Sequence, residues 1–299
     1  MSTVVSSALL LLVPLLLAAM GGLVHRASGV VNIGLEGQML AGALIGLVVS
    51  GWAGNWAIGL LAAALLGGVT SLAMTLVITR LKANEIIVGL GFNILVAGII
   101  GFVLKWELGV SGTLRIDGLD RIPRWDIPGV SSIPALRELF SGKDIIFWAA
   151  LLLVPALVWM LGHTRFGLRL RAAGDSPTAA ESLGVRIRPM REAAGFIAGV
   201  LAGIGGAYLS LAQVGLFNSL MIAGRGFIAL AAFYFGRNRP VPTALACLLF
   251  AFFDALQVSL QNGTSIGQLL NALPYLIVVL ALTISAQQQK LRTRKLSTR

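Results

Sequence analysis

The chain has 299 residues, of which 57% are hydrophobic and only 12% are charged, and its mean hydropathy is +0.88. A soluble domain carries roughly 25% charged residues, so this composition excludes a soluble enzyme. Lys and Arg exceed Asp and Glu by 11 charges, which in a soluble protein would suggest a nucleic-acid partner. Here apolar runs of membrane-spanning length surround the charges, and we expect an all-helical bundle in a membrane.

Nine apolar segments are long enough to cross a bilayer, which takes about 20 helical residues. They cover residues 4–24, 31–50, 55–78, 85–105, 144–162, 192–213, 219–236, 241–261 and 268–286. We predict one transmembrane domain over residues 1–286 and a basic tail over residues 287–299. With an odd number of spans, the first four and the last four run in opposite senses around the central fifth helix, which is the layout of an inverted repeat.

The second segment begins with glycines and polar side chains. Glu36 lies in SGVVNIGLEGQMLAG, where Gly29, Gly34 and Gly37 interrupt the entry into the helix. Glycine there permits either a close approach of two helices or a break whose backbone lines a cavity. Glu36 is therefore a candidate for a polar path through the membrane. The alternative is a capping role near the membrane surface.

Two connections between the segments are long. Residues 106–143 contain three prolines and are too short for a domain, so we expect an ordered loop. In residues 163–191, Asp175 or Ser176 is placed to cap a helix with Pro177 at its first position, and Gly184 ends it. This pattern predicts a helix of about two turns between basic arms, suited to be held by another protein. The alternative is a solvated basic loop.

Arg225 and Asp254 add two further charges within the predicted spans. A charge at the bilayer centre costs about 2.5–3.5 kcal/mol on insertion scales, so it normally faces a partner or a water-filled cavity. Arg225 could pair with Glu36 or Asp254, or bind the oxygens of a polar ligand. Asp254, Gln257 and Gln261 recur at helical spacing and share a face. Such polar groups serve either helix-to-helix hydrogen bonds or the path of a neutral solute. The candidate path residues are Asn32, Glu36, Asn93, Arg225, Asp254 and Gln257.

The distribution of basic residues predicts the orientation of the chain. One set of alternate connections, which includes residues 163–191 and the tail, holds 16 Lys and Arg. The opposite set holds six, and six acidic residues balance them. Because cytoplasmic loops retain the positive excess, the N-terminus and residues 106–143 are predicted outside and the C-terminus in the cytoplasm. The net charge then reports orientation and contact with anionic membrane lipids, and no nucleic acid is required.

Four segments of the sequence resemble one family of transport proteins. They are SGVVNIGLEGQMLAGAL near the start, ANEIIVGLGFNIL at 83–95, RFGLRLRAAGDSPTAAESLGV in the 163–191 connection, and AGRGFIALAAFYFGRNRP at 223–240. They resemble ATP-binding cassette (ABC) importer permeases of the branched-chain amino acid, ribose and nucleoside class, most closely the shorter nucleoside and simple-sugar subunit. The spacing Thr178-Ala179-Ala180-x-x-x-Gly184 resembles the EAA loop of such permeases, with Thr178 where the motif has Glu.

This resemblance implies a subunit that passes a nucleoside or simple sugar across the bacterial inner (plasma) membrane. A second, different permease would complete the pathway, a cytoplasmic ABC ATPase would drive it, and an external solute-binding lipoprotein would deliver the solute. In the family the EAA helix docks on the ATPase. This assigns Ala179, Ala180 and Gly184 to coupling, with Asp175 and Pro177 at the start of the same helix.

The alternatives to an ABC permease differ from it in their energy source or in having a catalytic site. The chain has no G-x-x-x-x-G-K-[ST] sequence, so we expect ATP on the partner subunit, no cofactor on this chain and no enzyme activity. An intramembrane serine protease would use Ser111 in GVSG, but His25 and His163 are predicted across a bilayer of roughly 30 Å. Those two histidines and Cys247 supply no metal cluster. An ion-coupled secondary transporter and a permease for branched-chain amino acids remain open.

Overall fold

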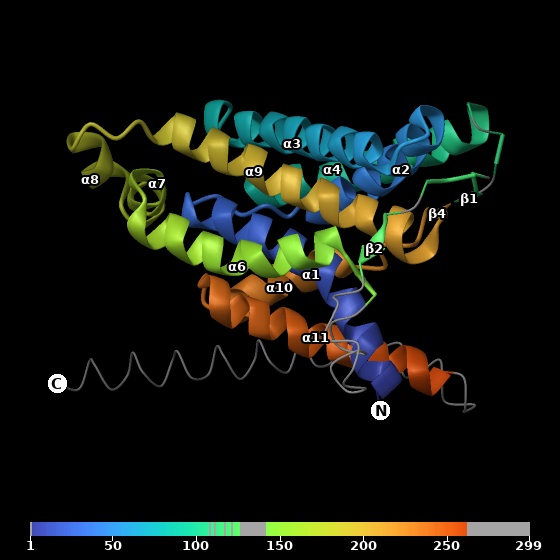
Figure 1. The fold of residues 1–299 in the computed structure, drawn as a ribbon. Helices are drawn as coiled ribbons and strands as arrows, with labels where there is room; N and C mark the ends of the chain where they lie inside the picture. Colours follow the sequence, from blue (N-terminus) through green and yellow to red (C-terminus); the bar gives the residue numbers. More distant parts are fainter. Residues whose placement is uncertain are drawn as a thin grey trace.

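Long apolar helices dominate the computed structural model, which describes residues 2–107, 109–110, 112–116, 118–120, 122–125 and 142–261 (Figure 1). Within these residues, seven helices are long and apolar enough to cross a membrane. They are α1 (Ser2–Ala27), α2 (Leu35–Ala53), α3 (Trp56–Arg80), α4 (Glu85–Trp106), α6 (Ile145–His163), α9 (Ile187–Tyr208) and α11 (Pro240–Gln261). The predicted helical membrane bundle is confirmed. The ninth predicted segment, 268–286, and the tail, 287–299, lie outside the described residues.

Shorter elements occupy the two ends of the bundle and its interior. The helices are α7 (Arg165–Asp175), α8 (Pro177–Ser182), the π-helical turn η1 (Leu209–Val214) and α10 (Arg225–Phe235). Two antiparallel pairs join β1 (Thr113–Leu114) to β4 (Phe217–Asn218), and β2 (Arg124–Trp125) to β3 (Lys143–Asp144). In Figure 1, α7 and α8 lie at one end of the bundle and the strand pairs lie at the other.

The seventh predicted segment differs from the observed structure. We expected a span over 219–236, but the helix begins only at Arg225. Ala223 and Gly224 have φ angles of +50° and +78°, outside the helical region, and Asn218 is paired in a strand. Eleven helical residues rise only about 16 Å, roughly half the thickness of the hydrocarbon core. The chain therefore enters this region as a non-helical segment and continues as a half-length helix.

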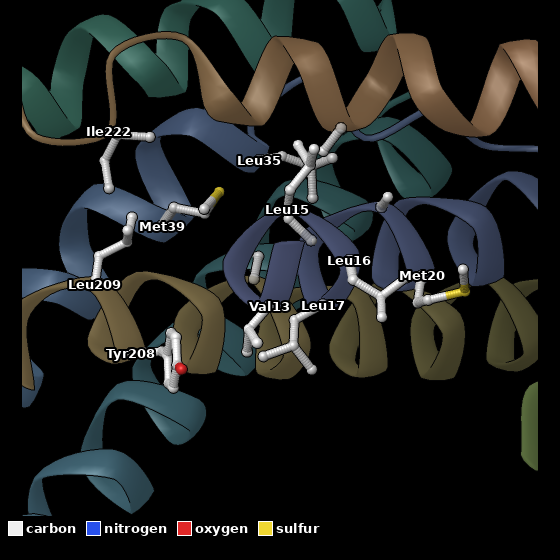
Figure 2. Packing of buried hydrophobic residues seen from close by; sticks show 14 of the residues in the cluster. Val13, Leu15, Leu16, Leu17, Met20, Leu35, Met39, Tyr208, Leu209 and Ile222 are labelled. Carbon is white, nitrogen blue, oxygen red and sulfur yellow. The ribbon is translucent and has the colours of Figure 1, made fainter. Parts of the chain in front are cut away.

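The interior of the bundle is formed by α1, α2 and α9, the most buried of the long helices. Figure 2 shows Val13, Leu16 and Met20 of α1 among side chains of the neighbouring helices, including Met39 of α2 and Tyr208 of α9. The fifth predicted segment, α6, packs against α1, α7 and α11 and is much less buried. In space, the enclosed centre is thus formed by α1, α2 and α9 and not by α6, and the inverted repeat remains a prediction.

Small residues bring α3 and α9 into close contact. A Cβ atom added at Gly199 would meet the carbonyl oxygen of Gly67, and one added at Gly203 would meet that of Ala63. On α9, Gly195, Gly199 and Gly203 are four residues apart, so they lie on nearly one face of the helix. Backbones this close require small side chains, which accounts for part of the high glycine content of the chain.

Candidate functional site

The chain between α1 and α2, residues 28–34, is not helical and is held by side chains from other helices. Val31 N–H donates to the carboxylate of Glu85 on α4 at 2.8 Å, and the Asn93 side-chain amide donates to the carbonyl of Ile33 at 3.0 Å. In a bilayer, no water replaces a missing backbone partner, so such a break needs partners from the protein. We call residues 28–34 the first break.

Asn32 and Asn93, two of the predicted path residues, stabilise the first break. The Asn32 side chain is 1% exposed; it accepts a hydrogen bond from Gly34 N–H and donates to Gln38 Oε1, both at 3.0 Å. Asn93 accepts from Gly37 N–H at 2.8 Å. These bonds match the alternative that we left open, in which the polar groups join helices. A role of either residue on the transport path stays a prediction.

A second non-helical segment, residues 215–224, leads into α10, and Glu36 caps that helix. Gly224 N–H donates to Glu36 Oε1 at 2.8 Å, and Gly226 N–H donates to Oε2 at 2.7 Å. The first amides of a helix have no partner within the helix, and its N-terminus favours a negative charge. The residue at the N-cap, Gly224, has no side chain to supply one. Glu36, on the first turn of α2, therefore serves as the cap of a different helix. We call residues 215–224 the second break.

Arg225 and Asp254 form an ion pair next to this cap. Arg225 Nη2 lies 3.0 Å from Asp254 Oδ2, and Nη1 donates to the carbonyl of Met221 at 2.9 Å. The side chains are 17% and 23% exposed. Of the two pairings expected for Arg225, the structure contains the one with Asp254. Gln257, one turn further along α11, is half-buried.

Glu36, Arg225 and Asp254 thus come together from three helices, and Asn32 and Asn93 lie at the first break beside them. The cluster offers guanidinium donors and carboxylate acceptors that remain partly accessible, which can bind hydroxyl groups or the polar edges of a heterocycle. Among the described residues, no group of three or more His, Cys, Asp and Glu side chains could hold a metal ion.

The short helix predicted in the 163–191 connection is present as α8. Ser176 stands at its N-cap, Pro177 at its first position, and Gly184 follows it with a φ angle of +79°. Of the two expected caps, Asp175 instead ends the preceding helix, α7. We did not predict α7. Its signal was the helical spacing of Phe166, Leu170 and Ala173.

One face of α8 packs against the rest of the protein, and the other face is exposed. Ala180 is 3% exposed and packs with Ala173 and Ile187, whereas Ala179 is exposed and Leu183 is 84% exposed. Beside α8 lies a groove of about 510 Å³. It is lined by Glu181, Gly184, Val185, Arg186, Ile187, Arg188 and Pro189. An exposed apolar residue next to a basic groove is suited to bind another protein.

Membrane-length helices, breaks stabilised by charged side chains inside the bundle, and a short helix at one end define a multi-pass membrane protein of the transport class. The sequence matches the family described as the permease component of the branched-chain amino acid transport system over residues 4–285. The chain belongs to this family, and it is a transport subunit rather than an enzyme.

Relatives of known name cover nearly the whole chain. The nucleoside ABC transporter permease protein NupC of Lactococcus lactis is 33% identical, over 94% of this chain and 91% of that protein. The guanosine ABC transporter permease protein NupQ of Bacillus subtilis is 33% identical, over 95% and 92%. Among solved structures, an inward-facing ABC transporter described as metal-chelate type shares the fold with a TM-score of 0.55. It is 16% identical, over 94% of this chain and 85% of that one.

Proposed function

We propose that this chain is the permease subunit of an ABC importer for nucleosides. The observation that carries the proposal is the similarity to nucleoside permease subunits over 94–95% of the chain. The polar cluster of Glu36, Arg225 and Asp254 supports it, because a nucleoside offers both hydroxyl groups and heterocycle edges to donors and acceptors. Asn32, Asn93 and Gln257 would contribute at the edges of the same path.

The proposed orientation follows from charge. The basic α7–α8 end would face the cytoplasm together with the C-terminus, and the β1–β4 end would face outwards. A cytoplasmic ABC ATPase would bind α8 through Ala179, Leu183 and the adjacent groove, and it would hold the ATP that this chain has no P-loop to bind. A solute-binding lipoprotein would dock on the β1–β4 end, and a second, different permease would complete the pathway in the inner membrane.

Reconstitution tests the proposed function directly. The chain, the second permease and the ATPase would be placed in liposomes with radiolabelled guanosine and a guanosine-loaded binding protein. We expect uptake that requires ATP and the ATPase and persists when ion gradients are collapsed. If uptake continued without the ATPase and stopped when the ion gradient was collapsed, the result would favour an ion-coupled secondary transporter instead.

The proposed docking surface has its own test. We expect Leu183→Asp to weaken co-purification of the ATPase at least several-fold, because an exposed apolar contact would be replaced by a charge. Leu220→Asp is the matched control, since Leu220 is similarly exposed, at 80%, but lies in the second break. Equal ATPase binding by both variants would exclude α8 as the docking element.

A further inference from the structure

We propose that Glu36 is a positioning residue that links movement of α7 to the second break, so that the two ends of the bundle move together. The inference rests on the proposed function, since it assigns a coupling route within an ATP-driven importer. It is carried by three consecutive contacts: α7 against the first break, the first break through Glu36 to α10, and the second break against β1.

The first contact joins α7 to the end of α1. A Cβ atom at Gly174 of α7 would lie 2.9 Å from the backbone nitrogen of Gly29 and would also meet the carbonyl oxygen of Ala27. Arg191 Nε donates to the Ser28 carbonyl at 3.2 Å and fastens α9 to the same place. The backbone of α7 therefore rests directly on the first break, with no side chain between them to absorb a displacement.

The second contact transfers the position of the first break to α10. The first break continues into α2, where Glu36 lies in the first turn and accepts from Gly224 and Gly226 at 2.8 and 2.7 Å. A Cβ atom at Gly226 would lie 2.6 Å from the Glu36 Cα, so the two backbones are also in contact. A carboxylate that binds two amides with its two oxygens fixes the start of α10 in both position and direction.

The third contact ties the second break to the far end of the bundle. Ser219 N–H donates to the Gly112 carbonyl at 2.9 Å, and the Asn218 side chain donates to Thr113 Oγ1 at 2.8 Å. Together with the β1–β4 pairing, these bonds hold residues 112–114 on the second break. A shift of the first break would thus reach the β1–β4 end through the contact between Glu36 and the start of α10.

Hydrogen exchange tests this link without any transport measurement. We expect Gly174→Ala to speed exchange of the first-turn amides of α10 several-fold in the purified permease, because the added methyl group displaces the first break. In a Glu36→Ala background, Gly174→Ala should add nothing further at those amides. Gly162→Ala is the matched control, since a Cβ there has nothing within 4 Å. Unchanged α10 exchange in Gly174→Ala would overturn the proposal.

Transport provides the second readout. In the reconstituted importer with guanosine, we expect Gly174→Ala, which lies outside the polar cluster, to keep ATP hydrolysis per assembled complex within about twofold and to lower uptake at least tenfold. Gly162→Ala, the matched control, should keep both at the wild-type level. A parallel loss of hydrolysis and uptake in Gly174→Ala would mean that this substitution only destabilises the fold and would overturn the link. Failure of the wild-type complex to transport guanosine would count against the proposed function, and hydrogen exchange would still decide the link.

Discussion

Gly226 shows how a single hydrogen atom in place of a side chain permits the cap by Glu36. A methyl group there would lie 2.8 Å from Glu36 Oε2 and closer still to the backbone of that residue. We expect Gly226→Ala to cost about 1–3 kcal/mol of stability, because the backbones must separate. Thermal unfolding of the purified permease in detergent measures this. The control is Gly91→Ala, where nothing lies within 4 Å; equal melting temperatures for the two variants would contradict the argument.

The ion pair of Arg225 and Asp254 predicts strong non-additivity. Either Arg225→Met or Asp254→Leu leaves one charge without its partner, which we expect to cost about 1–3 kcal/mol, reduced where water reaches the pair. The double variant should be less destabilised than the two single effects added together. A double-mutant cycle on thermal stability measures this coupling, and additive effects would show that the pair contributes nothing.

Only part of the cluster of Glu36, Arg225 and Asp254 could be predicted, because its contacts join residues that are far apart in the sequence. All three charged residues within the predicted spans stood out because apolar residues flank them in the sequence. The sequence allowed Arg225 to pair with either Glu36 or Asp254. It could not decide between them, because even Arg225 and Asp254 are 29 positions apart. Nothing local indicates that Glu36 binds amides 188 and 190 positions away, because a backbone N–H has no sequence signature.

Helix packing between α3 and α9 depends on the absence of side chains at the crossing. At Gly199 a larger residue would meet both the Gly67 carbonyl and the side chain of Ser71. We expect Gly199→Leu to prevent the close packing and to lower the yield of folded permease several-fold, seen as aggregation in size-exclusion chromatography. Gly98→Leu on α4, where a Cβ meets nothing within 4 Å, should keep a wild-type profile; identical behaviour of both variants would refute the assignment.

Among the elements, the long helices were predictable and the second break was not. Twenty apolar residues in a bilayer have few alternatives to a helix, which fixes α1 to α4, α6, α9 and α11 from hydropathy alone. Residues 219–224 are as apolar as a helix would be, yet they form turns. Their conformation depends on the strand partner of Asn218 and on positive φ angles at Ala223 and Gly224. Those determinants are tertiary, so a hydropathy window extends the helix six residues too far.

At the scale of the whole molecule, the Glu36 contact bears on the predicted inverted repeat. An inverted repeat would relate the second predicted segment to the seventh, observed as α2 and α10. Each of these helices begins after a break, and Glu36 in the first turn of α2 binds the first amides of α10. Two related helix starts that meet inside the bundle are typical of transporters built from repeats. The repeat stays a prediction, and this meeting point is where its axis would pass.

Orientation is the last property of the whole molecule that charge predicts. Cys247 is buried, so Cys247→Ala provides a background for single cysteines at Leu183, directly after α8, and at Arg115 beside β1, both exposed. We expect a membrane-impermeant maleimide to label Arg115→Cys in intact cells and Leu183→Cys only after permeabilisation, because the basic α7–α8 end stays in the cytoplasm. Labelling in the reverse order would place the α8 docking surface outside, where no ATPase could reach it.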